Sequence, residues 1–149
     1  MKVKRMRLLV WIVTFVLLLW GTLWADESWL RAKQVLVFDS QSVAAGGSAT
    51  SRKIDLKRTR GYFSLQYVLT GDGTVTLSYE LSNDGNIWIF PSTCGDSFPL
   101  TGLTKTSGPG GDGKDIVPVK PIIARFIRFK VTETGGANGV TISARLNYQ

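Results

Sequence analysis

Apolar and polar residues alternate one by one over long parts of this chain, and this period constrains the fold more than any other feature. Alternation puts apolar side chains on one face of a strand and polar ones on the other, so it indicates half-buried β-strands. Four runs show the pattern most clearly: residues 63–69, 75–81, 127–131 and 140–148. Less regular strands are predicted at residues 35–39, 51–56, 87–90 and 116–119.

The connections between these strands are short and rich in glycine. Residues 70–73 (TGDG) and 134–139 (TGGANG) join neighbouring runs tightly, as hairpin turns do. Residues 43–49 are small and predict a loop or a crossing between sheets, and the glycine-rich residues 104–114 predict a surface loop. About eight strands joined in this way predict an all-β fold, an antiparallel β-sandwich of jelly-roll type.

The first 25 residues have a different character. Lys2, Lys4, Arg5 and Arg7 precede an apolar stretch without charge, residues 8–25, which ends in Ala25. A basic head, an apolar stretch and a small residue before the cut are typical of a secretory signal peptide. The alternative is an uncleaved anchor, with residues 8–25 in the membrane. We therefore expect export, to the cell surface, the periplasm or the medium, of a single β-sandwich domain, residues 26–149.

Removing this leader changes the charge of the chain. The net charge falls from +7 to +3, because 14 Lys and Arg then face 11 Asp and Glu, and we expect no nucleic-acid partner. One basic cluster remains (Arg52, Lys53, Lys57, Arg58 and Arg60), which is interpreted as a solvated strand edge or, alternatively, as a polyanion-binding patch. The single cysteine, Cys94, cannot form an intrachain disulfide.

The residue types needed for catalysis are scarce. The chain has no histidine, which removes the commonest general base and the commonest metal ligand. Most aspartates lie beside glycine in predicted turns, where their side chains bond to nearby backbone. Glu80 and Glu133 lie in predicted strands, both at outward positions. We therefore expect that this protein is not an enzyme.

The stretch from Ser78 to Phe90, SYELSNDGNIWIF, contains the candidate ligand residues. Calcium prefers carboxylate and amide oxygens, and the candidate ligands are Asn83, Asp84, Asn86 and Asp112. The alternative is that Asn-Asp-Gly-Asn forms only a tight turn. Trp88 is expected in the core; the alternative is an exposed sugar-stacking surface with Phe90, Tyr62 or Trp29.

Three segments together resemble a known set of proteins: GYFSLQYVLTGDGTVTLSYELSNDG, LTKTSGPGGDGKDI and ARFIRFKVTETGGANGVTISARLN. They resemble small β-sandwich proteins of phage and prophage structural gene clusters, which are similar in outline to discoidin-like carbohydrate-binding jelly rolls. The resemblance rests on strand and turn pattern over residues 35–148. It implies a non-enzymatic role in assembly or attachment. The leader departs from it, because a virion protein assembles in the cytoplasm.

Together these observations predict an exported structural or interaction module that associates with itself or with another surface protein. An extended apolar arm is expected to complete a neighbour's sheet by strand addition, and its residues are Val35, Leu36, Val37 and Phe38. Alternatively, the arm pairs within its own sheet. The second hypothesis is a carbohydrate-binding module that uses Trp88 and Phe90 with Asn83 and Asp84, with calcium as an optional cofactor.

Overall fold

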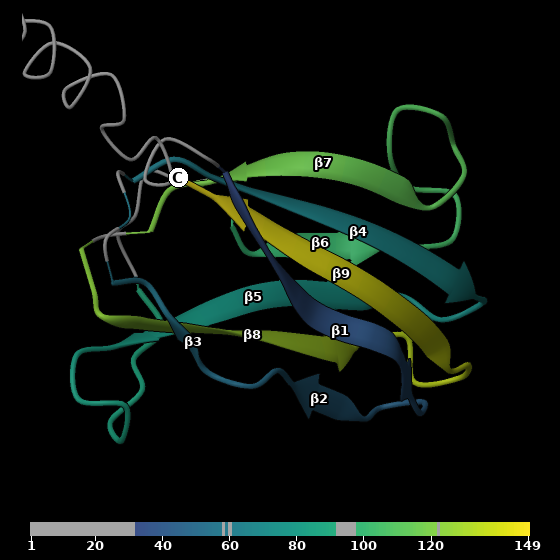
Figure 1. Cartoon of the computed structure of the whole chain (residues 1–149). Coiled ribbons are helices and arrows are strands. Elements are labelled where there is room, and N and C mark those ends of the chain that lie inside the picture. Colours follow the sequence, from purple (N-terminus) through teal and green to yellow (C-terminus); the bar gives the residue numbers. More distant parts are fainter. Residues whose placement is uncertain (1–31, 58, 60, 92–97, 122) are drawn as a thin grey trace, which may run out of the picture. The chain divides into compact units, whose positions relative to one another are not determined.

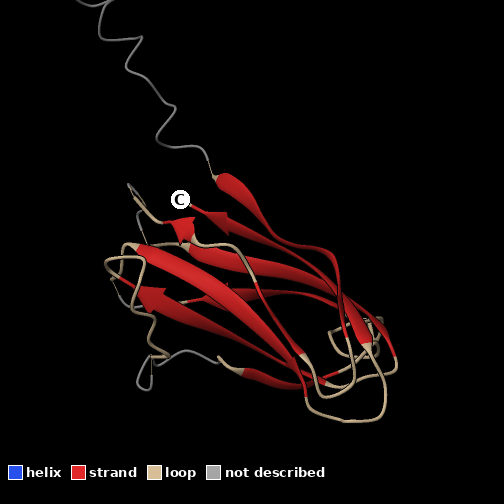
Figure 2. Ribbon diagram, turned by 90° about the horizontal axis from the view of Figure 1, so that it is seen from below, coloured by secondary structure: helices blue, strands red, loops and turns tan. Residues whose placement is uncertain are grey.

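A computed structural model of the chain describes residues 32–149, except residues 58, 60, 92–97 and 122. The predicted leader, Trp29, Arg58, Arg60 and Cys94 lie outside the described residues. Figures 1 and 2 show that the described part consists of strands and loops. Its strands are β1 (Lys33–Val43), β2 (Ser48–Thr50), β3 (Ile54–Asp55), β4 (Phe63–Gly71), β5 (Val75–Ser82), β6 (Leu100–Leu103), β7 (Lys114–Val119), β8 (Phe126–Glu133) and β9 (Val140–Tyr148).

The strands form two antiparallel sheets, as predicted. One sheet has the order β1-β9-β4-β7, and the other has the order β2-β8-β5-β6, with β3 also paired to β8. If β2 and β3 are taken as one broken strand along β8, this is the strand order of a jelly roll with two interleaved Greek keys. In the part of the chain that is described, no helix is long and apolar enough to cross a membrane.

Two turns that the sequence analysis interpreted as hairpins cross between the sheets instead. β4 pairs with β9 and β7, whereas β5 pairs with β8 and β6, so residues 72–74 lead from one sheet to the other. Residues 134–139 make the same kind of crossing between β8 and β9. The two crossings touch: a Cβ on Gly71, whose φ is 96°, would lie 2.8 Å from the carbonyl oxygen of Gly139. Glycine is needed here because the two backbones approach so closely.

The core lies between the sheets, where the alternating apolar faces meet. The four clearest runs of the sequence became β4, β5, β8 and β9, and their inward side chains are buried. The fully buried side chains of the core are those of Leu65, Leu69, Val75, Leu77, Tyr79, Ile127, Phe129, Val131, Ile142 and Leu146, with Tyr67 and Val119.

Outside these runs the predicted strands needed correction. The strand predicted at residues 51–56 is reduced to β3, Ile54–Asp55, and β2 lies before the predicted range. Between them, the backbone N–H of Ser51 still donates to the carbonyl oxygen of Phe129 in β8, at 2.8 Å. The strand predicted at residues 87–90 is reduced to one bridge, in which Leu81 and Ile89 exchange both backbone hydrogen bonds, at 2.9 and 3.0 Å. The short strand β6 was not predicted. Residues 43–49 were predicted to form a loop or a crossing between sheets, and they lie at a crossing, since β1 and β2 belong to different sheets.

The predicted assembly arm is part of β1, and it pairs with β9 of the same chain. Of the two predictions for the arm, addition to a neighbour's sheet and pairing within its own sheet, the structure has the second. A shift of register between Leu36 and Phe38 lets two consecutive residues, Val37 and Phe38, both be buried, which strict alternation forbids. β1 is nevertheless an edge strand, so strand addition along its outer side stays a prediction.

The sandwich has two ends, which are named here after one residue each. At the Ser82 end, Ser82 at the end of β5 pairs with Phe126 at the start of β8. At the Glu133 end, Val75 at the start of β5 pairs with Glu133 at the end of β8. Seven residues of extended strand separate the ends, roughly 23 Å.

Candidate functional site

The turn after β5 is held together by the carboxylate of Asp84. Its Oδ1 accepts hydrogen bonds from the backbone N–H groups of Asn86 and Ile87, at 2.8 and 2.9 Å, and from the hydroxyl of Ser82, at 2.9 Å. These donors, the Asn86 N–H first, keep the pKa of Asp84 below its ordinary value. The Asn-Asp-Gly-Asn segment is therefore a turn, which the bridge between Leu81 and Ile89 closes.

Trp88 is not a core residue, and this corrects the sequence prediction. Ile89 is opposite Leu81, so these two residues share one face and Trp88 points to the other. There its ring lies 4.3 Å from the guanidinium carbon of Arg128, on the outer face of the β5–β8 pair. Arg128 in turn donates from Nε to Glu80 at 2.6 Å. The prediction failed because it assigned inward and outward positions one residue out of register, and such a shift moves every side chain to the opposite face of the strand.

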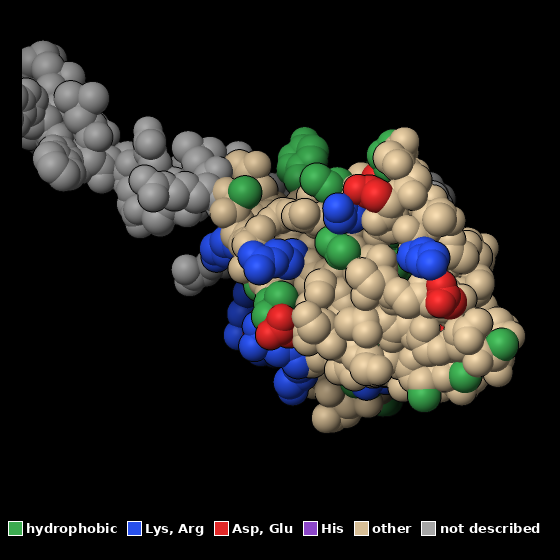
Figure 3. Space-filling view, turned by 90° about the vertical axis from the view of Figure 1, so that its right-hand side faces the viewer, with side chains coloured by type: hydrophobic (Ala, Val, Ile, Leu, Met, Phe, Trp, Pro, Cys, Tyr) green, Lys and Arg blue, Asp and Glu red, His purple; other side chains and the backbone are tan. Residues whose placement is uncertain are grey.

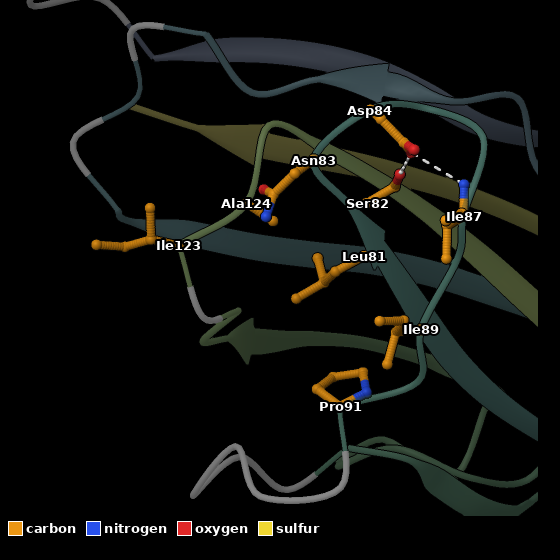
Figure 4. Close-up of a pocket in the computed structure, with 9 residues that line it drawn as sticks. All are labelled: Leu81, Ser82, Asn83, Asp84, Ile87, Ile89, Pro91, Ile123 and Ala124. Atoms are coloured by element: carbon orange, nitrogen blue, oxygen red, sulfur yellow. Dashed lines mark hydrogen bonds between the residues drawn. The ribbon is translucent and has the colours of Figure 1, made fainter.

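An apolar pocket of about 310 Å³ lies beside this turn, at the Ser82 end. Leu81 lies between two walls, with Ile87, Ile89 and Pro91 on one side and Ile123 and Ala124 on the other (Figure 4). Ser82, Asn83 and Asp84 form its polar border. Of the predicted ligand residues, Asn83 and Asp84 line this pocket. Trp88 and Phe90 do not line it, although their neighbours in the sequence, Ile87, Ile89 and Pro91, do.

The isoleucines of this pocket are unusually exposed for such apolar side chains. Ile87 is 68% exposed, Ile89 64% and Ile123 101%, and Phe90 next to them is 45% exposed. A concentration of exposed apolar side chains around a concave surface is typical of a binding site. This patch cannot be recognised from the sequence, although Ile87 and Ile89 are within the candidate segment, because Ile123 reaches the same place from the β7–β8 connection.

Two cations border the pocket from the side of Phe126. The ammonium of Lys53 lies 5.3 Å from the centroid of the Phe126 ring, and the guanidinium carbon of Arg125 lies 4.7 Å from it. The backbone N–H of Arg125 also donates to Oδ1 of Asn83, at 3.3 Å. Two cations thus lie next to the polar border that Ser82, Asn83 and Asp84 give to an apolar pocket.

The predicted calcium ligands do not form one group. Asp112 belongs to the loop between β6 and β7, which leaves the sheet at Leu103, opposite Val75. That is the Glu133 end, so Asp112 is a strand's length away from Asn83, Asp84 and Asn86. Asp112 pairs instead with Lys114, at 3.1 Å, and this contact lowers its pKa. Within the described residues, no three acidic or cysteine side chains gather around a possible metal position.

Glu133 was predicted to point outward, but it is buried, with 2% of its surface exposed. Its carboxylate accepts hydrogen bonds from backbone N–H groups of three sheet-to-sheet connections: Gly46 at 2.6 Å, Thr74 at 3.2 Å, Gly135 at 2.7 Å and Gly136 at 2.9 Å. These donors, Gly46 first, lower the pKa of Glu133. Around this network, the surface of the Glu133 end is mostly uncharged, with Lys and Arg gathered at one side (Figure 3).

Comparison with known proteins gives only distant similarities. No protein-family model and no curated protein sequence matches the chain. Among solved structures, the VP2 subviral particle protein of infectious bursal disease virus is similar, at 12% identity and a TM-score of 0.44. That match covers 79% of this chain but 32% of VP2, so the chain spans about a third of the length of VP2.

Two smaller proteins match over most of their own length. The SPBc2 prophage-derived protein YomS is 10% identical, with a TM-score of 0.41, and the match covers 78% of this chain and 93% of YomS. PliG of Aeromonas hydrophila, a periplasmic inhibitor of g-type lysozyme, is 10% identical, with a TM-score of 0.37, over 79% of this chain and 86% of PliG. Viral and prophage proteins are thus among the similar structures, at the level of an all-β fold only, and a discoidin-like relationship stays a prediction.

Proposed function

We propose that this protein is a non-enzymatic interaction module that binds another protein chain through the apolar pocket at the Ser82 end. The observation that supports this most is the exposure of Ile87, Ile89 and Ile123 around one concave surface. Exposing these side chains to water is unfavourable, and a partner that covers them gains their burial. With the predicted leader, the module acts outside the cytoplasmic membrane.

The bonding of the carboxylates supports a non-enzymatic role. Asp84 and Glu133 are bound by backbone N–H groups, and Asp72 and Asp112 are paired with lysines, Asp72 with Lys105 at 2.6 Å. In each of the four the pKa is lowered. A general acid needs the opposite, a raised pKa near the working pH. These carboxylates thus stabilise turns and connections.

The edge strands of both sheets have features that oppose pairing with another chain, which favours the pocket as the contact surface. β1 is interrupted by two register shifts, and β7 contains Pro118, which has no N–H to donate. In the other sheet, β6 is short and β2 and β3 are shorter still. Bulges, proline and short edge strands are the features that prevent edge-to-edge pairing. Self-association by strand addition is therefore less favoured than binding at the pocket.

Carbohydrate binding is less well supported by the aromatic side chains. One face of the Trp88 ring is covered by Arg128, and Tyr62 lies beside β4, in the other sheet from β5. A sugar would have to use the remaining face of Trp88 with Phe90. Quenching of tryptophan fluorescence by a panel of glycans, with Trp88→Ala as the control, tests this alternative.

Selection from a library of random peptides displayed on phage tests the proposed function. We expect peptides that bind the purified protein and lose binding when Ile89→Ser or Ile123→Ser is introduced. Ile116→Ser is the matched control, because Ile116 is 62% exposed but lies on β7, away from the pocket. If the selected peptides bind both pocket variants as well as they bind the control, the proposal is wrong.

A further inference from the structure

We infer that the chain segment bound at the pocket is acidic, with an apolar side chain that enters the pocket and Asp or Glu residues beside it that face Lys53 and Arg125. This inference rests on the proposed function and adds the chemical class of the partner. It depends on the positions of the two cations and on the small number of acids that neutralise them.

Lys53 lies directly against the turn that borders the pocket. A methyl group on Gly85 would be 3.3 Å from Nζ of Lys53 and 3.3 Å from the Phe126 ring. The ammonium thus lies over the ring, 5.3 Å from its centroid, and next to the backbone between Asp84 and Asn86. A cation held on an aromatic ring keeps its charge at a defined position.

Arg125 follows Ala124, one of the residues that line the pocket wall. Its guanidinium is weakly neutralised: Nη2 is 4.0 Å from Oδ2 of Asp55, and the same oxygen is 3.5 Å from Nζ of Lys57. One carboxylate is therefore shared by two cations, and Lys53 adds a third positive charge. Half of the Arg125 side chain is exposed, which leaves the guanidinium available to a partner.

The acids nearest to the pocket offset only part of this charge. Glu80 is bound to Arg128 on the outer face of the sheet, at 2.6 Å. Asp84 keeps its negative charge, because the two backbone N–H groups and the Ser82 hydroxyl that bind its Oδ1 are neutral. Lys53, Lys57 and Arg125 together still exceed Asp55 and Asp84 by one positive charge. An acidic segment beside an apolar anchor residue would therefore complement both the border and the interior of the pocket.

The shape of the site favours a peptide over an anionic membrane. A pocket of about 310 Å³ can receive one or two side chains, whereas a bilayer would cover protruding residues and leave the pocket empty. A second copy of this chain is disfavoured, because a face-to-face dimer would bring Lys53 and Arg125 of both copies together.

The test uses the peptides selected on phage, now analysed for composition and charge dependence. We expect the peptides that depend on Ile89 to be enriched in Asp and Glu next to an apolar residue. We expect Lys53→Gln with Arg125→Gln to weaken their binding by about tenfold or more, while Lys105→Gln at the Glu133 end leaves it unchanged. Circular dichroism confirms that the double variant is folded, and weaker binding of the wild type at high salt gives the same information without a variant.

Three results would overturn the inference, and they are distinct from failure of the proposed function. Peptides that depend on Ile89 but show no excess of acids leave the protein-binding function intact and disprove the acidic partner. Binding that neither salt nor the double variant weakens does the same. Stronger binding to mixed phosphatidylcholine–phosphatidylserine vesicles than to any peptide, lost in Lys53→Gln with Arg125→Gln, would identify a membrane as the partner. Peptides that ignore Ile89→Ser would instead refute the proposed function itself.

Discussion

Glu133 joins three connections at one end of the sandwich through a single carboxylate, so we expect its charge to matter for stability. Four backbone N–H groups bind the ionised form. In the folded protein they hold the pKa of Glu133 below its ordinary value of 4.5. A group with a lowered folded-state pKa stabilises the protein above its unfolded-state pKa. This stabilisation is lost as the pH falls through the folded-state value.

Glu133→Gln should therefore lower the melting temperature near neutral pH, because the amide presents N–H groups to backbone donors and has no charge. Below pH 4.5 the wild type loses stability as Glu133 is protonated, and the variant should show a smaller loss over the same range. Thermal melts as a function of pH measure both effects. Glu80→Gln is the control, since Glu80 is partly exposed and bound to one arginine. Equal pH profiles for wild type and Glu133→Gln would contradict this account.

Asp84 gives a second prediction, which concerns calcium. Its Oδ1 already accepts three hydrogen bonds, and Asp112, one of the other predicted ligands, lies at the opposite end of the sandwich. We expect melting curves in calcium and in a chelator to coincide, because the remaining oxygens are too few for the six to eight ligands that calcium takes. A higher melting temperature in calcium, abolished by Asp84→Ala, would show that the turn binds the ion after all.

At the scale of the element, the stability of β1 tests whether the N-terminal arm packs on the core in solution. Phe38 is 4% exposed and pairs with Ala144 of β9. If β1 belongs to its own sheet in solution, Phe38→Ala should reduce the free energy of unfolding by about 3–5 kcal/mol. Leu36→Ala is the control, because Leu36 is partly exposed on the same strand. Chemical denaturation followed by tryptophan fluorescence measures both variants, and an unchanged stability for Phe38→Ala would mean that the arm is not packed on the core in solution.

Strand elements were predicted well where a long run alternates, and poorly where other factors decide. β4, β5, β8 and β9 followed directly from the sequence, because burial of one face fixes their pattern. The turns after β4 and β8 did not reveal that they cross between sheets, since a tight glycine turn looks the same in both cases. The register shift in β1, which buries both Val37 and Phe38, likewise depends on pairing with β9.

The candidate site was predicted only in part, and the reason is again tertiary. The segment from Ser78 to Phe90 was identified from its turn residues and aromatics, and part of it lines the pocket. Ile123 belongs to a connection more than 30 residues later, and no local pattern relates it to Ile89. Glu133 has the same strand parity as the inward residues Phe129 and Val131, so the outward prediction went against the alternation. Three connections fold over its carboxylate and supply its hydrogen bonds.

At the scale of the whole molecule, the question is whether copies of this chain associate, as the sequence analysis predicted. The edges of both sheets have features that oppose pairing: register shifts in β1, Pro118 in β7, and short strands at the edges of the second sheet. At the pocket, apolar contact between two copies would be opposed by repulsion between their cations. We therefore expect the purified protein to be monomeric at micromolar concentrations.

Light scattering across that range measures the oligomeric state directly. Its dependence on Ile89→Ser and on salt then identifies the surface that is used. A discrete dimer that Ile89→Ser abolishes, and that high salt strengthens by screening the cations, would make a second copy the partner of the pocket. A growing assembly that Ile89→Ser leaves intact would instead place the contact on a sheet edge. In that case β1 is the first candidate, because its outer side offers the longest row of backbone groups among the edge strands.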